Sequence, residues 1–108
     1  MSVLKGLKPV PVWHYFEEIC RIPRLSKNES QIREYLLSFA RENKLSTKED
    51  TTGNILITRP SHPDFKNRKT VVLQSHMDMV GEKNADHPHD WVKDPIIPTV
   101  DNGWVRAN

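Results

Sequence analysis

A histidine and an aspartate two positions apart, His76 and Asp78, are the residues of this chain whose types and spacing could do chemistry. In an extended backbone, side chains at this spacing project from the same face. A neutral imidazole binds divalent metals, and a neighbouring carboxylate orients the ring and raises its basicity. The pair therefore predicts part of a metal site in which His76 is the ligand. A second interpretation stays open, in which His76 caps a strand and simply bonds Asp78.

The residues just before this pair are expected to position it. Val71 to Gln74 is a short apolar run, typical of a strand that is buried on both faces of an α/β sheet. Ligands in open α/β sheets gather outside the carboxyl ends of the strands, and His76 and Asp78 lie where this strand would end. Ser75 would point to the opposite face, so it makes no nucleophile–base pair with His76.

A rival group of potential ligands is Asp86-His87-Pro88-His89-Asp90. It lies in Glu82 to Pro98, a long polar segment that predicts a loop with little regular structure. Because Pro88 restricts the backbone and the loop is expected to be flexible, we interpret the group as solvated loop. A small mononuclear site built from His76 and this loop is an alternative that calorimetry with Zn²⁺ would detect.

Two helices are predicted in the first part of the chain. The first covers Val10 to Ile22, with apolar side chains at three-to-four spacing, and Pro23 follows its end. Ser26-Lys27-Asn28-Glu29 has the S-x-x-E pattern of a capping box, which satisfies two backbone N–H groups at the start of a helix. The helix that it opens carries an apolar stripe of Ile32, Tyr35, Leu36, Phe39 and Ala40, and Asn43 or Lys44 is expected to end it.

Short strands and turns are predicted after these helices. Leu45 to Glu49 and Ile55 to Thr58 flank the turn signal Asp50-Thr51-Thr52-Gly53-Asn54, which predicts a hairpin. Within Val100 to Ala107, Asp101-Asn102-Gly103 predicts a turn that enters a further strand.

The composition restricts the class of protein. The chain has 108 residues, 36% apolar and 28% charged, with a net charge of +2 and scattered basic residues. This is one domain at most, without the basic stripe of a nucleic-acid-binding protein. The single cysteine, Cys20, predicts a buried packing thiol in a reducing compartment. The N-terminus has no signal-peptide pattern and no apolar run approaches the ~20 residues of a membrane span, so we expect a cytoplasmic chain with no membrane partner.

With these residues in view, almost the whole chain resembles the N-terminal part of aminoacyl-histidine dipeptidases, which are Xaa-His dipeptidases (peptidase D) of the M20 metallopeptidase family. The matching residues are Trp13, Phe16, Ile19-Cys20, Ile22-Pro23, Asp50, Gly53-Asn54-Ile55-Leu56-Ile57, Asn67-Arg68-Lys69, Val71 to Val80, His89-Asp90, Lys93-Asp94-Pro95-Ile96 and Trp104-Val105. So many ordered matches favour the metal interpretation over the simple His–Asp pair.

The resemblance implies an activity, a fold and roles for two residues. The activity is hydrolysis of dipeptides with a C-terminal histidine, using two zinc ions, for which cobalt or manganese could substitute. The implied fold is the N-terminal portion of a zinc-peptidase-like three-layer α/β sandwich, with residues 1–108 as a fragment of the catalytic domain. His76 matches the first metal ligand, and Asp78 matches the catalytic-site carboxylate that orients that imidazole. A second, inserted domain closes over the substrate in such enzymes and often makes homodimers.

The resemblance also implies that this chain lacks most of the active site. The bridging aspartate, the glutamate base, the remaining ligands and the lid domain of such enzymes have no counterpart in it. A catalytic zinc needs about three protein ligands, and His76 with Asp78 supplies one ligand and one orienting group. We therefore expect the isolated chain to be inactive and to expose apolar surface that promotes association. Two alternatives stay open: a non-catalytic partner-binding module and the small metal binder described above.

Overall fold

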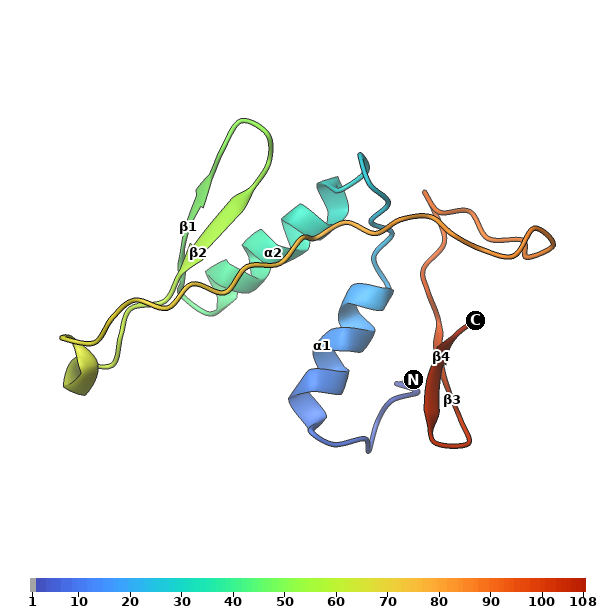
Figure 1. Ribbon diagram of the computed structural model, residues 1–108, viewed down its shortest axis with the longest axis horizontal. Helices are drawn as coiled ribbons and strands as arrows, with labels where there is room; N and C mark the ends of the chain where they lie inside the picture. The colour runs from blue at the N-terminus through green and yellow to red at the C-terminus, as the bar shows by residue number, and fades with distance from the viewer. Residues whose placement is uncertain (1) are drawn as a thin grey trace. The chain divides into compact units, whose positions relative to one another are not determined.

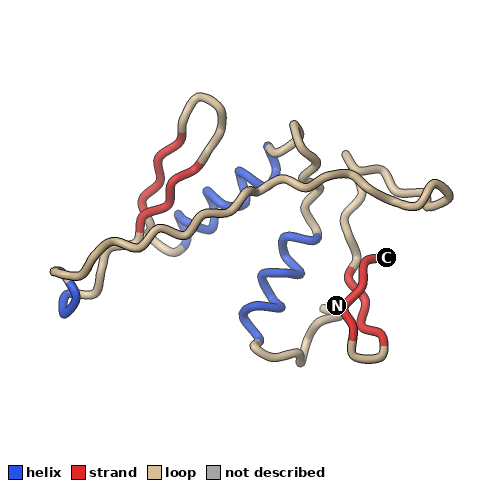
Figure 2. The backbone as a smooth tube through the Cα atoms, in the orientation of Figure 1, coloured by secondary structure: helices blue, strands red, loops and turns tan. Residues whose placement is uncertain are grey.

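The chain folds into short helices and antiparallel hairpins that are joined by long stretches without regular structure (Figure 2). The computed structural model describes residues 2–108. Its elements, labelled in Figure 1 where there is room, are α1 (Val10–Cys20), α2 (Ser30–Glu42), β1 (Ser46–Glu49), β2 (Ile55–Thr58), the 3-10 helix η1 (Pro63–Phe65), β3 (Pro98–Asp101) and β4 (Trp104–Ala107). Among these described residues, neither α1 nor α2 has the length and apolar character needed to cross a bilayer.

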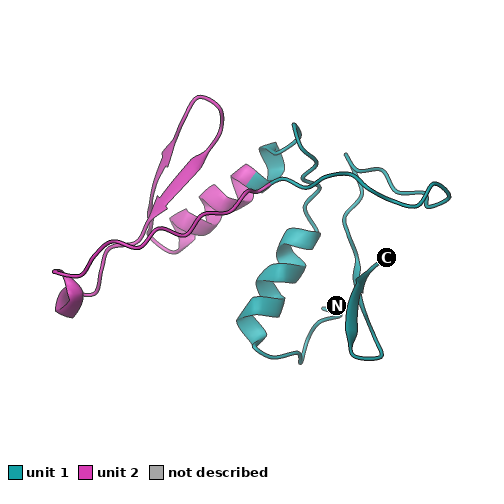
Figure 3. Ribbon diagram, viewed as in Figure 1, with its two compact units in different colours: residues 1–32, 78–108 teal, residues 33–77 magenta. Residues whose placement is uncertain are grey.

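The chain divides into two compact units, which Figure 3 distinguishes by colour. Unit 1 combines residues 1–32 with residues 78–108, and unit 2 is the segment 33–77 between them. One boundary passes through α2 after Ile32, and the other passes between Met77 and Asp78. The predicted pair His76 and Asp78 is therefore divided between unit 2 and unit 1.

Helix α1 contributes two buried residues, Glu17 and Cys20, to unit 1. Pro9 precedes its first residue and Pro11 lies in its first turn, where the missing N–H of proline costs nothing. The helix ends at Cys20, before the predicted Ile22. The Arg21 N–H is shared between the Glu17 and Glu18 carbonyls and the Ile22 N–H bonds the Ile19 carbonyl three residues back, which tightens the last turn. Cys20 is buried as predicted, with 4% of its surface exposed, and burial raises the pKa of its thiol.

The buried acidic residue of α1 is held by hydrogen bonds from the N-terminal segment. Glu17 accepts hydrogen bonds from the Ser2 hydroxyl and from the Val3 backbone N–H at 3.1 Å, and the Arg21 guanidinium lies 3.5 Å away. The hydrogen bond from Ser2 is the main cause that lowers the pKa of Glu17. Leu4, which follows Val3 in the chain, is also buried, with 2% of its surface exposed.

Strands β3 and β4 form an antiparallel hairpin in unit 1, with Asp101 paired to Trp104. Asn102 and Gly103 both have positive φ, 47° and 82°, which is the backbone of the two-residue type I′ turn. The predicted turn is therefore confirmed, and the strand that it enters pairs with the residues just before it. The segment Glu82 to Pro98 is irregular up to the first residue of β3, as expected.

Helix α2 confirms the predicted apolar stripe. Ile32 and Ala40 are buried, with 3% and 0% of their surfaces exposed, and Tyr35, Leu36 and Phe39 are half-buried. The end of the helix is also confirmed, because Lys44 has a left-handed backbone (φ 56°) and the Leu45 N–H donates to the Ala40 carbonyl at 2.8 Å. This pattern satisfies a carbonyl that the end of the helix would otherwise leave unpaired.

Strands β1 and β2 form the predicted hairpin of unit 2, in register from Ser46–Thr58 to Glu49–Ile55. Asp50 organises its turn: its carboxylate accepts hydrogen bonds from the backbone N–H groups of Thr52 and Asn54 and from their side chains. Gly53 supplies the positive φ of 97° that the turn requires. An ion pair between Arg33 and Glu49 ties the hairpin to α2 within the same unit.

The predicted strand Val71 to Gln74 is wrong for this chain. These residues form no strand, and Figure 2 draws the long run that follows η1 as loop. Val71, Val72 and Leu73 are 79%, 76% and 93% exposed. Within residues 2–108, Val71 to Ser75 take part in no backbone–backbone hydrogen bond. A strand forms only when a neighbouring strand satisfies its backbone, and no such neighbour is present in the described part of the chain.

The Asp50 turn predicts a pH dependence of the hairpin in unit 2. Hydrogen bonds to its carboxylate, those from Asn54 first, lower the pKa of Asp50 from 3.8 to about 2. Because the pKa of Asp50 is lower in the folded chain, its stabilisation of the turn is complete above about pH 3.8. This stabilisation is lost as the pH falls through about 2. We expect the NMR amide shifts of Thr52 and Asn54 to report loosening of the turn over that interval.

The matched variants are Asp50→Asn and Asp86→Asn, the second in an exposed part of unit 1. Asp50→Asn should remove the acid-dependent change at the turn, whereas Asp86→Asn should leave it intact. A turn that is unchanged between pH 4 and pH 2 in the unsubstituted chain would contradict the assigned role of Asp50.

Candidate functional site

His76 lies at the end of the exposed extended segment in unit 2. Its side chain is exposed, and the hydroxyl of the preceding Ser75 donates to the His76 backbone carbonyl at 3.2 Å. That bond occupies the Ser75 hydroxyl with a backbone group, in keeping with the prediction that Ser75 is no nucleophile. An exposed imidazole can reach an ion or a ligand without first having to be uncovered, which is what a metal ligand requires.

Asp78 lies in unit 1 and is held in place by the segment that joins α1 to α2. Its carboxylate Oδ2 accepts a hydrogen bond from the Ser26 hydroxyl at 2.5 Å. The next residue, Met79, forms a parallel bridge with Leu25, in which the Met79 N–H donates to the Arg24 carbonyl and the Ser26 N–H donates to the Met79 carbonyl. Asp78 is half-buried. It is positioned by the hydrogen bond from Ser26 and by the main-chain pairing of the next residue, Met79.

The predicted capping box at Ser26 to Glu29 is therefore wrong. Helix α2 begins only at Ser30, and the Ser26 hydroxyl bonds Asp78 rather than a helix N–H. Glu29 accepts a hydrogen bond from the Lys27 N–H at 2.7 Å, within a turn in which Lys27 has a positive φ of 71°. The Ser26 hydroxyl, which the local pattern assigns to the start of the helix, instead bonds a carboxylate 52 positions later in the sequence.

The segment after Asp78 packs closely against the same joining segment. A Cβ atom added at Gly81 would lie 2.7 Å from the Leu25 side chain and 3.0 Å from the ring of Trp91. Gly81 therefore lets the chain pass between these two side chains as it leaves the bridge. This close approach keeps residues 78 to 81 against Arg24 to Ser26.

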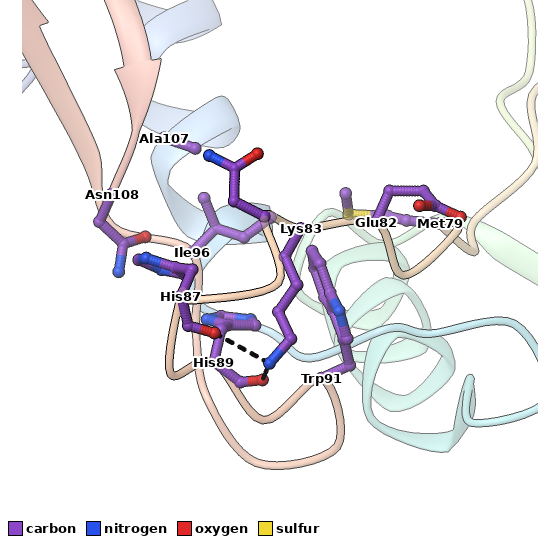
Figure 4. Close-up of a pocket in the computed structure, with 10 residues that line it drawn as sticks. Met79, Glu82, Lys83, His87, His89, Trp91, Ile96, Ala107 and Asn108 are labelled. Carbon is purple, nitrogen blue, oxygen red and sulfur yellow. Dashed lines mark hydrogen bonds between the residues drawn. The ribbon is translucent and has the colours of Figure 1, made fainter.

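Two members of the rival group, His87 and His89, line a cavity of about 390 Å³ in unit 1, shown in Figure 4. The Lys83 ammonium donates at 2.9 Å to the backbone carbonyls of both His87 and His89. The two imidazoles lie 6.2 Å apart and nearly parallel, and His89 meets Trp91 edge-on at 4.5 Å. His87 and His89 are half-buried, so the expected solvated loop is a partly ordered loop in which lysine holds the backbone.

The ligand chemistry of the described chain is incomplete. No group of three or more His, Cys, Asp or Glu side chains between residues 2 and 108 is placed to hold a metal ion. A catalytic zinc needs about three protein ligands and an open position. The described residues therefore do not by themselves place the donors that such a centre needs.

Sequence reasoning missed two residues that shape this region. Ser26 contacts Asp78 across 52 positions of sequence, and no local pattern could have signalled that contact. Lys83 organises the histidine loop through backbone carbonyls, which carry no sequence signature at all.

The proteins that this chain is similar to are dipeptidases, as the sequence resemblance predicted. The chain is 48% identical over 107 residues to the cytosol non-specific dipeptidase of Escherichia coli (strain K12), which covers 99% of this chain and 22% of that protein. Its fold matches the crystal structure of the aminoacylhistidine dipeptidase from Vibrio alginolyticus with a TM-score of 0.91 and 43% identity, over 97% of this chain and 21% of that one. No protein-family model matches the chain.

Two conclusions follow from these comparisons. The predicted resemblance to aminoacyl-histidine dipeptidases is confirmed, and the mixed arrangement of helices and strands corresponds to the N-terminal portion of a dipeptidase structure. The chain spans only about a fifth of the length of either relative.

The role of Lys83 can be tested by hydrogen exchange. We expect Lys83→Met to speed amide exchange at His87 and His89 by roughly fivefold, since losing hydrogen bonds of this kind costs about 1 kcal/mol. Lys93→Met, in the same irregular segment, is the matched control and should leave those amides unchanged. Equal exchange rates in the Lys83 variant and the unsubstituted chain would show that the ammonium does not hold the loop.

Proposed function

We propose that this chain forms the N-terminal part of a metal-dependent dipeptidase that cleaves dipeptides with a C-terminal histidine. The observation that carries the proposal is the similarity to two dipeptidases along nearly the whole chain, 99% and 97% of its length. Dipeptide hydrolysis is common to the names of both relatives. The preference for C-terminal histidine rests on the family resemblance and on the name of the structural relative alone.

The metal would be zinc, with two ions in the complete enzyme, and cobalt or manganese would suit the same donors. His76 would supply one ligand, and Asp78 would orient its imidazole and strengthen it as a base toward the metal. The exposed imidazole and the positioned carboxylate support these roles. The bound metal would supply Lewis acidity and an activated water, and the other ligands and the general base would come from the rest of the enzyme.

The exposed segment Val71 to Ser75 supports a larger α/β sheet in the complete enzyme. In an extended strand, Val71 and Leu73 would face one side and Val72 the other, and all three are now exposed. A strand that is apolar on both faces belongs inside a sheet with layers on each side. The proposal therefore places this segment within a three-layer sandwich whose other strands belong to the four-fifths of the relatives that this chain does not cover.

The same proposal includes the partners and the compartment. The substrate would be a dipeptide, and the complete enzyme would pair as a homodimer through its second domain. The name of the Escherichia coli relative supports a cytosolic location. The two-faced apolar segment also supports a second candidate, a non-catalytic module that binds a partner through Val71 to Ser75.

Association of the isolated chain should depend on Leu73, whose side chain is 93% exposed. Burying a leucine side chain is worth about 1.5–3 kcal/mol, so the chain is expected to self-associate through this segment. Leu73→Lys should shift sedimentation velocity profiles toward monomer. Val92→Lys, at an exposed apolar residue of unit 1, should not. A monodisperse unsubstituted monomer with a cooperative melt would count against this expectation.

The catalytic proposal is best tested in a chimera in which this chain replaces the matching 107 residues of the Escherichia coli dipeptidase. We expect zinc-dependent hydrolysis of β-alanyl-histidine by the chimera and none by the isolated chain. His76→Ala should reduce the turnover to background, and Asp78→Asn should lower it about 10- to 100-fold, as is typical when the group that orients a metal ligand is lost.

His62→Ala is the matched control, because His62 is another exposed imidazole of unit 2. It should leave the activity of the chimera unchanged. An active chimera that tolerates His76→Ala would refute the ligand assignment, and turnover by the isolated chain would refute its predicted inactivity. An inactive but folded chimera would favour the partner-binding module.

A further inference from the structure

The turn between β3 and β4 carries a reactive amide that the proposed function does not use. Asn102 and Gly103 form this turn, and Asn102 is the one asparagine of the chain that a glycine follows. Both residues are exposed. Asparagine is a thermolabile residue, because the next backbone nitrogen can attack its side-chain carbonyl carbon. Glycine favours that attack, since it has no Cβ atom to crowd the approach.

The surroundings of Asn102 leave this reaction open. Within residues 2–108, neither its side-chain amide nor the Gly103 N–H takes part in a hydrogen bond. A Cβ atom added at Gly103 would have nothing within 4 Å beyond its chain neighbours, so no other group shields the turn. Asn54, in the hairpin of unit 2, has the opposite arrangement. Its Nδ2 donates to the Asp50 carboxylate at 2.7 Å and to the Thr52 hydroxyl at 3.1 Å.

We propose that Asn102 is a site of spontaneous deamidation that breaks the β3–β4 hairpin. The Gly103 nitrogen forms a bond to Asn102 Cγ, the Cγ–Nδ2 bond breaks, and Nδ2 leaves as ammonia with the proton of the Gly103 N–H. Solvent water then opens the resulting cyclic imide. Opening at the Cγ carbonyl gives aspartate, and opening at the main-chain carbonyl gives isoaspartate, in which the main chain runs through the side chain.

The two products differ in their effect on the hairpin. The register of a hairpin is fixed by its turn type and loop length. Aspartate keeps the length of the main chain and tolerates the positive φ of 47° at position 102. Isoaspartate adds one carbon atom to the main chain, so the turn no longer joins Asp101 to Trp104 in the observed register. The hairpin is therefore lost in the isoaspartate form alone.

The first test is to age the 108-residue chain at mildly alkaline pH and to map its peptides by a fragmentation method that separates isoaspartate from aspartate. We expect the amide of Asn102 to be lost while those of Asn54 and Asn84 are retained. Asn84 is the matched control in unit 1, because it is also exposed but an alanine follows it. Asn54 is the control for an amide that hydrogen bonds hold in a turn. Loss at Asn102 that is no faster than loss at Asn84 would overturn the inference.

The second test compares the separated aspartate and isoaspartate forms by NMR. Cross-strand contacts between Thr99 and Arg106, which are paired in the hairpin, should persist in the aspartate form and be absent from the isoaspartate form. Asn102→Gly removes the amide and leaves a Gly-Gly pair that suits a type I′ turn, so its hairpin should survive ageing.

Two results would overturn the proposed effect on the hairpin. One is an isoaspartate form that keeps the contacts between Thr99 and Arg106, and the other is loss of those contacts in the aged Asn102→Gly variant. Neither result bears on the proposed dipeptidase function, because no residue to which that proposal gives a role takes part in this reaction.

Discussion

The short parallel bridge between Leu25 and Met79 is the interaction on which unit 1 depends. It joins the segment between α1 and α2 to residues that follow far later in the chain, and it carries Asp78 with it. Gly81 allows the close approach, and the Ser26 hydroxyl reaches the carboxylate from the paired backbone. This pairing holds the backbone next to Asp78 in an otherwise irregular segment.

A second feature is that residues 2–108 form neither a group of metal ligands nor the expected strand before His76. The H-x-D pair is predicted to supply one ligand and one orienting group, and the apolar segment before it is exposed and forms no strand. Both shortfalls agree with a chain that matches about a fifth of two dipeptidases. A sheet and a metal centre are each assembled from several parts of a polypeptide, so neither can be derived from the H-x-D pair and its neighbours in sequence alone.

Local structure was predictable wherever neighbours along the chain determine it. The apolar stripe of α2, the turn built on Asp50 and Gly53, and the turn at Asn102 each need only residues within a few positions. The predictions failed where a remote partner decides. The local pattern predicts a helix cap at Ser26, which bonds Asp78 instead, and a strand at Val71 to Gln74, which finds no pairing partner in the described chain.

The sequence by itself determined the kinship with dipeptidases, the H-x-D pair, the burial of Cys20 and the positions of the two hairpin turns. These depend on residue type and spacing, which are written in the chain. Only the tertiary structure decided which hydroxyl fixes Asp78, which cation holds the histidine loop, and that the apolar run before His76 stays exposed. Those outcomes depend on backbone groups and on contacts across tens of residues, and backbone groups are the same in every sequence.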